Sequence, residues 1–244
     1  LKEGEGKSIK NNNKKYKRFS EHIGQFPIVI ISPTDTNLIL EGSDVRRKYL
    51  DSSIAQYKQS YLQLLIQHNK TLKQRNSLLK QFSDRNYFDE IALDIYDQQM
   101  IELGSSIHKE RTNFLKELTP VFNNYYTDIS ESKEEVNLNF KSQLSGNDYG
   151  KILKESLVKD RASNYSQCGI HKDDILFEMN GHPIKKIGSQ GQQKSFLIAL
   201  KLAQFELIKN KIGFKPILLL DDIFDKLDDR RVLILISFVN KNVA

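Results

Sequence analysis

The spacing of hydrophobic residues changes several times along the 244 residues of the chain. Near the N-terminus, the β-branched run Ile28-Val29-Ile30-Ile31 predicts a buried strand. Pro33 ends this strand because proline has no N–H to give to a sheet, and Thr34 or Asp35 then stands where a helix cap is needed. Earlier in the chain, Asn11-Asn12-Asn13 is typical of a turn between two short strands.

The middle of the chain has the period of amphipathic helices. Apolar residues recur every three, four or seven positions from 43 to about 82, and again from about 89 to 118. Residues 83–88 are polar and predict a turn, so we expect an antiparallel hairpin of two long helices. Pro120 weakens any continuation, although residues 121–126 keep a helical pattern. The hairpin is either an ordinary helical layer or an arm projecting from a sheet-based head, and its length favours the arm.

Beyond residue 130 strands and helices alternate, which predicts an α/β fold. Residues 136–140 alternate apolar and polar side chains, as a half-buried strand does. Asn180-Gly181 is a strong hairpin signal. The expected elements are a strand at 136–140, a helix at 149–158, strands at 174–179 and 182–187, a long helix from 189, a strand at 217–220 and an apolar element at 233–239.

Composition narrows the class of protein only slightly. No apolar run is long enough to span a bilayer, and no secretory signal begins the chain. The single cysteine, Cys168, excludes an internal disulfide and suits the cytoplasm. The histidines and this cysteine have no metal-ligand spacing. The net charge of +6 favours nucleic acid only weakly, because most basic proteins simply have solvated lysine-rich faces.

The segment Ser189-Gln190-Gly191-Gln192-Gln193 opens an apolar helix and is the first candidate site. Ser189 is a good N-cap, and Gln192 at the third helical position would complete a capping box. Gly191 has no Cβ, so a ligand can approach the backbone there. The helix end offers free N–H groups and a partial positive charge, which suit an anion. The alternative is a well-capped core helix without a ligand.

A second candidate site is the segment Ile217-Leu218-Leu219-Leu220-Asp221-Asp222, which predicts a buried strand ending in two carboxylates. Ligands of α/β folds bind at this end of the strands. Facing a nucleotide, Asp221 would hold Mg²⁺ and Asp222 would act as general base for the attacking water. The alternative is a solvated strand end, but the glycine-containing helix start upstream favours the nucleotide. A complete Gly-x-x-x-x-Gly-Lys-Ser/Thr phosphate loop does not occur in the chain.

Together these residues resemble the RecF family, bacterial DNA-repair ATPases of the ABC/SMC-like class. Residues 189–193 resemble its signature motif, 217–222 its Walker B motif and 225–228 its D-loop. Gly169 to Asp174 are similar to the family's Gly-Pro-His-Arg-Asp-Asp. The order of the motifs also matches. Further similarity lies in the segments leading into and along the arm, at 32–35, 46–51, 72–80, 93–97 and 103–104.

The chain also departs from the family pattern. Ile170 replaces the expected Pro, Lys172 the Arg and Tyr96 the usual Trp, and Asp225 stands where the D-loop normally has Ser. The largest departure is the missing phosphate loop, which we expect upstream of the first residue, a leucine rather than a methionine. The resemblance then divides the chain into the end of a first head lobe at 1–40, a helical arm at 41–130 and a second head lobe at 131–244.

The resemblance implies an ABC/SMC-like ATPase head with a long helical arm. ATP and Mg²⁺ would bind between two heads of a homodimer, with Asp221 and Asp222 on one protomer and the signature residues Ser189 to Gln193 of the other closing on the γ-phosphate. Asp225, Leu227 and Asp228 would form the D-loop. The family uses this clamp on duplex DNA near single-strand gaps, in recombinational repair and replication restart. It works with RecR, and with RecO, in helping RecA onto the gap.

Non-specific binding of duplex DNA needs only Lys and Arg at the phosphates. The residues that we expect in this role are Arg46, Arg47, Lys48, Lys73 and Arg75, with a solvated helix face as the alternative for each. A different class of function also remains open, a non-catalytic SMC-like structural or DNA-binding module that never carried a phosphate loop. Without that loop, the 244 residues alone would not hydrolyse ATP, whereas a complete parent protein would be a slow ATPase.

Overall fold

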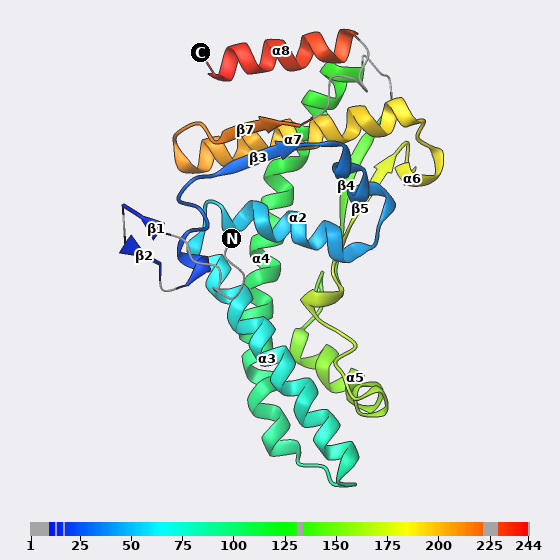
Figure 1. The fold of residues 1–244 in the computed structure, drawn as a ribbon. Helices are drawn as coiled ribbons and strands as arrows, with labels where there is room; N and C mark the ends of the chain where they lie inside the picture. Colours follow the sequence, from blue (N-terminus) through cyan, green and yellow to red (C-terminus); the bar gives the residue numbers. More distant parts are fainter. Residues whose placement is uncertain (1–9, 13, 17, 131–133, 222–228, 244) are drawn as a thin grey trace, which may run out of the picture.

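A long helical hairpin, with α5 beside its lower part, projects from a head that holds the sheets, α2, α7 and α8 (Figure 1). The computed structural model describes residues 10–12, 14–16, 18–130, 134–221 and 229–243. The hairpin consists of α3 (Gln59–Asp84) and α4 (Glu90–Ser130), which pack against each other. The helical arm predicted from the apolar period is therefore confirmed.

The predicted helix at 43–82 is wrong in one respect, because the structure has two helices there. Three residues lie between the end of α2 (Ser43–Ala55) and the start of α3. At this break the side chain of Gln56 accepts a hydrogen bond from the Ile28 N–H at 2.6 Å. The apolar period continues through the break because Ile54 and Tyr61, on either side of it, are both fully buried in the same core. No glycine or proline marks the break in the sequence.

Pro120 does not end the second helix, contrary to the weakening that we expected. α4 runs for 41 residues with Pro120 inside it. Proline removes the N–H that would bond to the carbonyl of Lys116, but both residues are exposed, so water can satisfy that carbonyl. On the opposite face, Leu118 and Phe122 are completely buried. Burial of this face stabilises the helix past the proline.

The strands of the two apolar runs pair with each other in parallel. β3 (Ile28–Ile31) and β7 (Ile217–Leu220) are in register from Ile28 with Ile217 to Ile31 with Leu220. The prediction of strands buried throughout is wrong, because burial alternates along both. α7 contacts β3 on one face, where Val29 is buried. The opposite face exposes Ile28, Ile30, Ile217 and Leu219 by 36–47% within the described part of the chain.

A second sheet, antiparallel, lies beside the arm base. β4 (Val136–Lys141) pairs with β5 (Asp174–Met179) over its whole length. The turn at Asn180 and Gly181 has positive φ at both residues, as predicted for a tight hairpin. The return strand predicted at 182–187 is wrong beyond its first two residues. β6 (His182–Pro183) gives way to α6 (Ile184–Ile187), since proline cannot extend the ladder and Ile184 turns into the core.

The central element of the head is α7 (Gln190–Ile212), which is buried almost all round between Ser195 and Ile208. It packs along α4, and Phe196 meets Phe122 with 4.7 Å between ring centroids. Gly213 ends it with a φ of 80°, a left-handed conformation that favours glycine. The remaining elements are β1 (Lys10–Asn11), β2 (Lys14–Lys15), η1 (Phe19–Glu21), η2 (Pro33–Thr36), α1 (Asn37–Leu40), α5 (Tyr149–Ser163), η3 (Ile170–Lys172) and α8 (Asp229–Val243).

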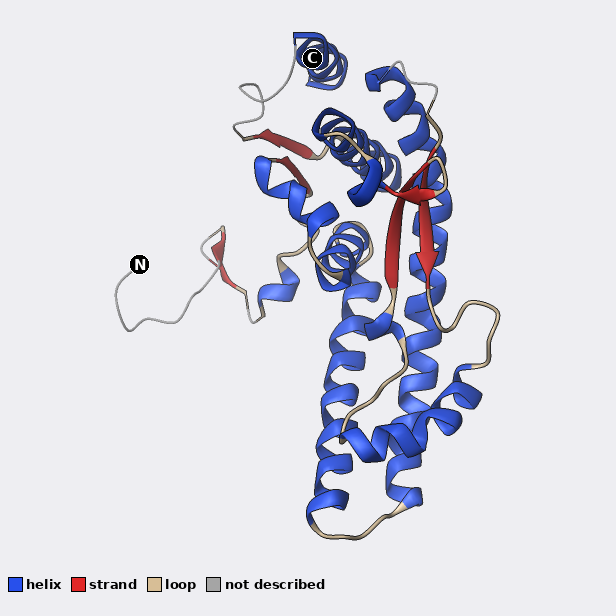
Figure 2. Ribbon diagram, turned by 90° about the vertical axis from the view of Figure 1, so that its right-hand side faces the viewer, coloured by secondary structure: helices blue, strands red, loops and turns tan. Residues whose placement is uncertain are grey.

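Seen from the side, the lower part of the hairpin is entirely helical and the strands lie at and above its base (Figure 2). The short β1–β2 hairpin confirms the turn predicted at residues 11–13. Among the described residues, no helix combines the length and apolar content that crossing a membrane requires.

Candidate nucleotide site

The predicted capping box at the start of α7 is confirmed. The Ser189 hydroxyl accepts from the Gln192 N–H at 3.2 Å, and the Gln192 side-chain oxygen accepts from the Ser189 N–H at 2.7 Å. Ser189 and Gln190 are exposed. The N–H groups of Gln190 and Gly191 have no acceptor within the helix, because they belong to its first turn. The start of α7 therefore presents backbone donors at the surface, as an anion site needs.

Gly191 leaves room beside this helix end, and a guanidinium fills part of it. A Cβ on Gly191 would lie 3.4 Å from Nη2 of Arg231, which comes from α8. The Nε of Arg231 donates to the hydroxyl of the buried Ser195 at 2.8 Å. Sequence reasoning missed Arg231, because nothing local places a residue of the last helix next to the signature segment.

Two of the three signature glutamines, Gln192 and Gln193, have their side chains held by hydrogen bonds within the chain. The side-chain nitrogen of Gln192 donates to Glu134, which in turn accepts from the Tyr126 hydroxyl at 2.9 Å. The side-chain nitrogen of Gln193 donates to the carbonyl of Gly188 at 2.9 Å. These contacts fix the shape of the helix start, and they leave the backbone of the first turn as the group facing outward.

The predicted metal ligand Asp221 lies at the carboxyl end of β7. It is exposed, and its N–H donates to the carbonyl of Ile31 at 2.9 Å, which extends the parallel pairing by one residue. Asp222, the predicted general base, and the D-loop residues Asp225, Leu227 and Asp228 lie outside the described residues. In the described part, no group of three or more His, Cys, Asp or Glu is arranged to hold a metal.

The sequence also contains Gly6-Lys7-Ser8, but position 1, where the phosphate-loop pattern needs its first glycine, is Leu1. Residues 1–8 lie outside the described part of the chain. The described residues that follow form the short strands β1 and β2, whereas a phosphate loop leads into a helix.

The structure keeps the start of α7 well apart from the sheet edge of the same chain. Asp35, just after β3, pairs with Lys201 of α7 at 2.7 Å, so the edge that carries Asp221 lies beside the middle of α7. Ser189 precedes Lys201 by twelve residues, which is about 18 Å of helix. Figure 1 shows α7 extending past the tips of both strand arrows. One chain therefore does not bring its own Ser189 to its own Asp221.

Three of the predicted DNA contacts are occupied within the protein. Arg46 donates to both carboxylate oxygens of Asp174, at 2.7 and 3.0 Å. Arg47 donates to the carbonyl of Asp173 at 2.7 Å, and burial lowers its pKa. Arg75 has no exposed surface.

The buried side chain of Arg75 joins three elements. It pairs with Asp97 at 2.5 Å and with Asp160 at 2.7 Å, and it donates to the hydroxyl of Ser166. Burial alone would lower the pKa of Arg75, but these two carboxylates raise it and keep the guanidinium charged. Arg75 therefore has no surface to offer to DNA, whereas Lys48 and Lys73 are exposed on α2 and α3.

The segment Gly169 to Asp174 has a structural role that the sequence did not reveal. Nη1 of Arg111 donates both to the carbonyl of Ile170 and to a carboxylate oxygen of Asp173, each at 2.7 Å. Nε2 of His171 lies within hydrogen-bond distance, 3.1 Å, of the carbonyl of Ser166. The segment thus ties the start of β5 to the arm.

Comparison with known proteins agrees with this architecture, although no family model matches the chain. The DNA replication and repair protein RecF of Flavobacterium johnsoniae is 53% identical over 240 residues, which are 98% of this chain and 67% of that protein. RecF of Cytophaga hutchinsonii is 44% identical, over 99% of this chain and 64% of that protein. This chain thus spans about two thirds of the length of these relatives.

Solved structures of RecF proteins also resemble this chain over nearly its whole length. The recombination mediator protein RecF-ATP in the RecFOR pathway superposes with a TM-score of 0.87 at 36% identity, covering 96% of this chain and 65% of that one. A second structure, of RecF-ATPrS, gives a TM-score of 0.85 at 35% identity. The fold is that of an ABC/SMC-like ATPase head with a long helical arm, as predicted. The chain belongs to the RecF family.

Proposed function

We propose that this chain forms part of an ATP-dependent clamp on DNA, acting in recombinational repair and replication restart at gapped duplexes. The observation that supports this most strongly is the position of Ser189, about 18 Å along α7 from Lys201, which pairs with Asp35 next to the edge that carries Asp221. A nucleotide at that edge needs a second copy of the chain to supply the signature backbone. Nucleotide would then hold two heads together.

In this proposal the first turn of α7 binds the γ-phosphate of the nucleotide on the partner head. The free N–H groups of Gln190 and Gly191 point along the helix axis, where the partial positive charge favours an anion. Ser189 caps the turn, while Gln192 and Gln193 hold its shape through their side chains. Asp225, Leu227 and Asp228 would lie at the same contact between heads.

On the other side of the nucleotide, we assign Asp221 to Mg²⁺ and Asp222 to the attacking water. Asp221 is exposed at the carboxyl end of a parallel strand, where an oxygen ligand for Mg²⁺ fits. Mg²⁺ would neutralise charge on the phosphates during transfer. Asp222 would accept the proton of the water, and its side chain is one methylene shorter than glutamate. A shorter reach makes proton transfer depend on close approach of the heads, so hydrolysis would be slow and would release the clamp.

For the DNA contact we retain Lys48 and Lys73, because both are exposed, and we leave out Arg46, Arg47 and Arg75, which the protein itself engages. The related structures belong to the RecFOR pathway. We accordingly propose RecR, and with it RecO and RecA, as partners.

The experiment that tests this proposal uses the full-length protein, meaning these residues together with the rest of the family's length. DNA retention and phosphate release are measured in one preparation, with ATP and Mg²⁺. Asp222→Asn should keep ATP-dependent DNA retention while turnover falls by about a hundredfold. Loss of DNA retention, or unchanged turnover, would show that Asp222 is structural.

The second candidate is a non-catalytic SMC-like structural or DNA-binding module, which needs only this fold and exposed cations such as Lys48 and Lys73. It predicts that the full-length protein binds DNA equally well with and without ATP. The two candidates therefore differ in one control of the same experiment, DNA retention without nucleotide.

A further inference from the structure

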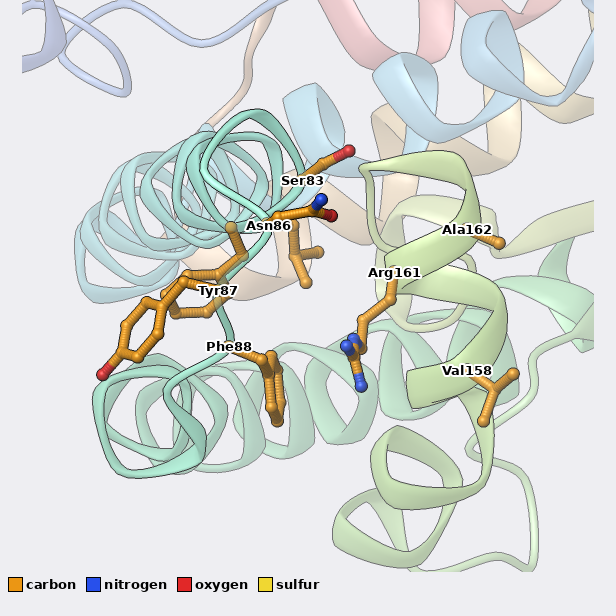
Figure 3. Close-up of a pocket in the computed structure, with 9 residues that line it drawn as sticks. Ser83, Asn86, Tyr87, Phe88, Val158, Arg161 and Ala162 are labelled. Atoms are coloured by element: carbon orange, nitrogen blue, oxygen red, sulfur yellow. The ribbon is translucent and has the colours of Figure 1, made fainter.

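The outer end of the arm carries a cavity that the nucleotide site does not involve. It has a volume of about 480 Å³ and lies between the α3–α4 turn and α5, with Asn86, Tyr87 and Phe88 on one side and Val158 and Arg161 on the other (Figure 3). Its floor is a small separate core in which Leu79, Phe82 and Leu93 are buried.

Aromatic rings shape one wall of this cavity. Phe82 meets Phe88 edge to face with ring centroids 5.3 Å apart, and Tyr87 packs on Phe82 at 6.1 Å. Although Phe82 is buried, Tyr87 is 59% exposed and Val158, opposite, is 79% exposed. Tyr87 and Val158 thus expose apolar surface on opposite sides of the cavity, which is wide enough for one or two side chains of a ligand.

Arg161 is the only ionisable cation or carboxylate among the residues that line the cavity. Its guanidinium carbon lies 4.1 Å from the centre of the Phe88 ring, and Figure 3 shows its side chain reaching from α5 toward that ring. Within the described residues it makes no ion pair. Stacking on Phe88 leaves the edge of the guanidinium, with its parallel N–H donors, available to a carboxylate.

We infer that this cavity, which we call the arm-tip groove, binds an acidic peptide segment of a partner protein. The segment would place an apolar side chain over Phe82 and between Tyr87 and Val158, and an Asp or Glu carboxylate on the fork of Arg161. This combination of an aromatic wall and a single unpaired arginine is the composition of a peptide anchor point. The positive charge of Arg161 favours the acidic residue of the peptide, and the apolar surfaces of Tyr87 and Val158 favour an apolar residue next to it.

A single-stranded nucleic acid fits the groove less well. Backbone tracking needs several cations in a row, and the groove offers one. Asp84 and Asp89, on the same turn, would repel phosphates, and Tyr87 donates weakly toward Asp89 at 3.4 Å. The proposed peptide needs a cation at one point only, which Arg161 supplies, whereas each phosphate of a bound strand would need its own.

The test measures fluorescence anisotropy of the labelled peptide Gly-Asp-Asp-Phe-Asp-Leu-Gly with an amidated C-terminus, so that its only carboxylates are side chains. The full-length protein is titrated into it, as are Arg161→Glu and the matched control Lys159→Glu. Lys159 is exposed on the same helix and does not line the groove. Both substitutions change the net charge equally. Circular dichroism checks that both variants remain folded.

We expect micromolar binding that Arg161→Glu weakens about tenfold or more and Lys159→Glu changes less than about twofold. Arg161→Lys should bind weakly too, because it keeps the charge but loses the fork. Peptides with Asn for Asp, or with Ser for Phe and Leu, should each lose affinity. No binding of the acidic peptide, or equal losses in Arg161→Glu and Lys159→Glu, would overturn the inference.

Two further outcomes would assign the groove to another occupant. If labelled oligothymidylate binds, loses affinity in Arg161→Glu, and the peptide does not bind, then the groove is a nucleic-acid site. If Arg161→Glu abolishes self-association of the protein in sedimentation, then a second copy occupies the groove. Either result would replace the acidic peptide as the ligand.

Discussion

Arg111 of the arm and Asp173 of the head lie 2.7 Å apart in a buried ion pair, with side-chain exposures of 2% and 0%. Arg111 also pairs with Asp51 of α2 at 3.0 Å, so one guanidinium connects α2, α4 and the segment before β5. The geometry of the arm relative to the head thus depends on a charge that is taken out of water. Removing one partner of such a pair costs more than the pair itself contributes.

Asp173→Asn should destabilise the protein by about 3 kcal/mol, because it leaves the Arg111 charge only partly compensated in the interior. Asp44→Asn provides the control, since Asp44 contacts Lys48 at 3.9 Å on an exposed helix face. That change should cost less than about 0.5 kcal/mol. Urea unfolding followed by circular dichroism measures both. Equal effects would mean that the Arg111 pair is not important for stability.

A substitution at Gly104 can test how closely the arm packs against α5. A Cβ at this helical position would lie 2.5 Å from Cε1 of the buried Tyr149. Gly104→Ala gains about 1 kcal/mol of helix propensity, but the clash should outweigh it and destabilise the protein by roughly 1–3 kcal/mol.

The neighbouring Ser105 is exposed on the same helix, so Ser105→Ala supplies the control and should be neutral or slightly stabilising. Thermal unfolding compares the two variants. A more stable Gly104→Ala would show that Tyr149 moves aside at little cost.

His68 should make stability depend on pH. It is fully buried, and burial together with His171 and Arg111 lowers its pKa to about 4. The unfolded chain then binds the proton more readily, so the stabilising contribution is complete above about pH 6.5 and is lost as the pH falls toward 4.

Between pH 7 and pH 5 this residue should cost roughly 2 kcal/mol of stability. His68→Leu should therefore lose less stability than the unchanged protein over that interval, while His182→Leu, at an exposed site, should lose as much as the unchanged protein. Unfolding free energies measured at pH 7 and pH 5 for the three proteins test this prediction. A His68→Leu variant that loses as much as the unchanged protein would argue against a buried neutral histidine.

Lys48 and Lys73 should contribute to DNA binding through phosphate contacts. In the full-length protein, Lys48→Gln and Lys73→Gln should each weaken ATP-dependent duplex binding a few-fold. Each should also reduce the slope of affinity against salt by about one. Lys154→Gln, exposed on α5, is the control. If neither substitution changes the slope, the duplex contacts lie elsewhere on the protein.

Much of this fold followed from local patterns. The period of apolar residues located α4 and α7, and the capping box at Ser189 formed with the predicted partners. Local patterns failed where distant segments decide the outcome. The break after Ala55 depends on Gln56 reaching Ile28, and the exposure of Ile30 depends on which sheet face α7 covers.

At the candidate site, too, the sequence predicted the local features but not the contacts between distant segments. Arg75 and Arg46 looked like surface cations, but their carboxylate partners Asp160 and Asp174 lie 85 and 128 residues away in sequence. No local pattern reveals such pairs. Arg231 approaches Gly191 for an equally non-local reason, because α8 folds back over the start of α7.

The most direct test of the proposed clamp is sedimentation of the full-length protein with and without ATP. Ser189→Asp keeps an N-cap but places a negative charge where the partner's γ-phosphate would bind, and Ser189→Arg blocks the same position with bulk. Both variants should still bind ATP as monomers, and neither should dimerise when ATP is added, whereas the unchanged protein should. A Ser189→Asp or Ser189→Arg protein that dimerises with ATP as readily as the unchanged protein would contradict the assignment of the signature segment to the partner's nucleotide.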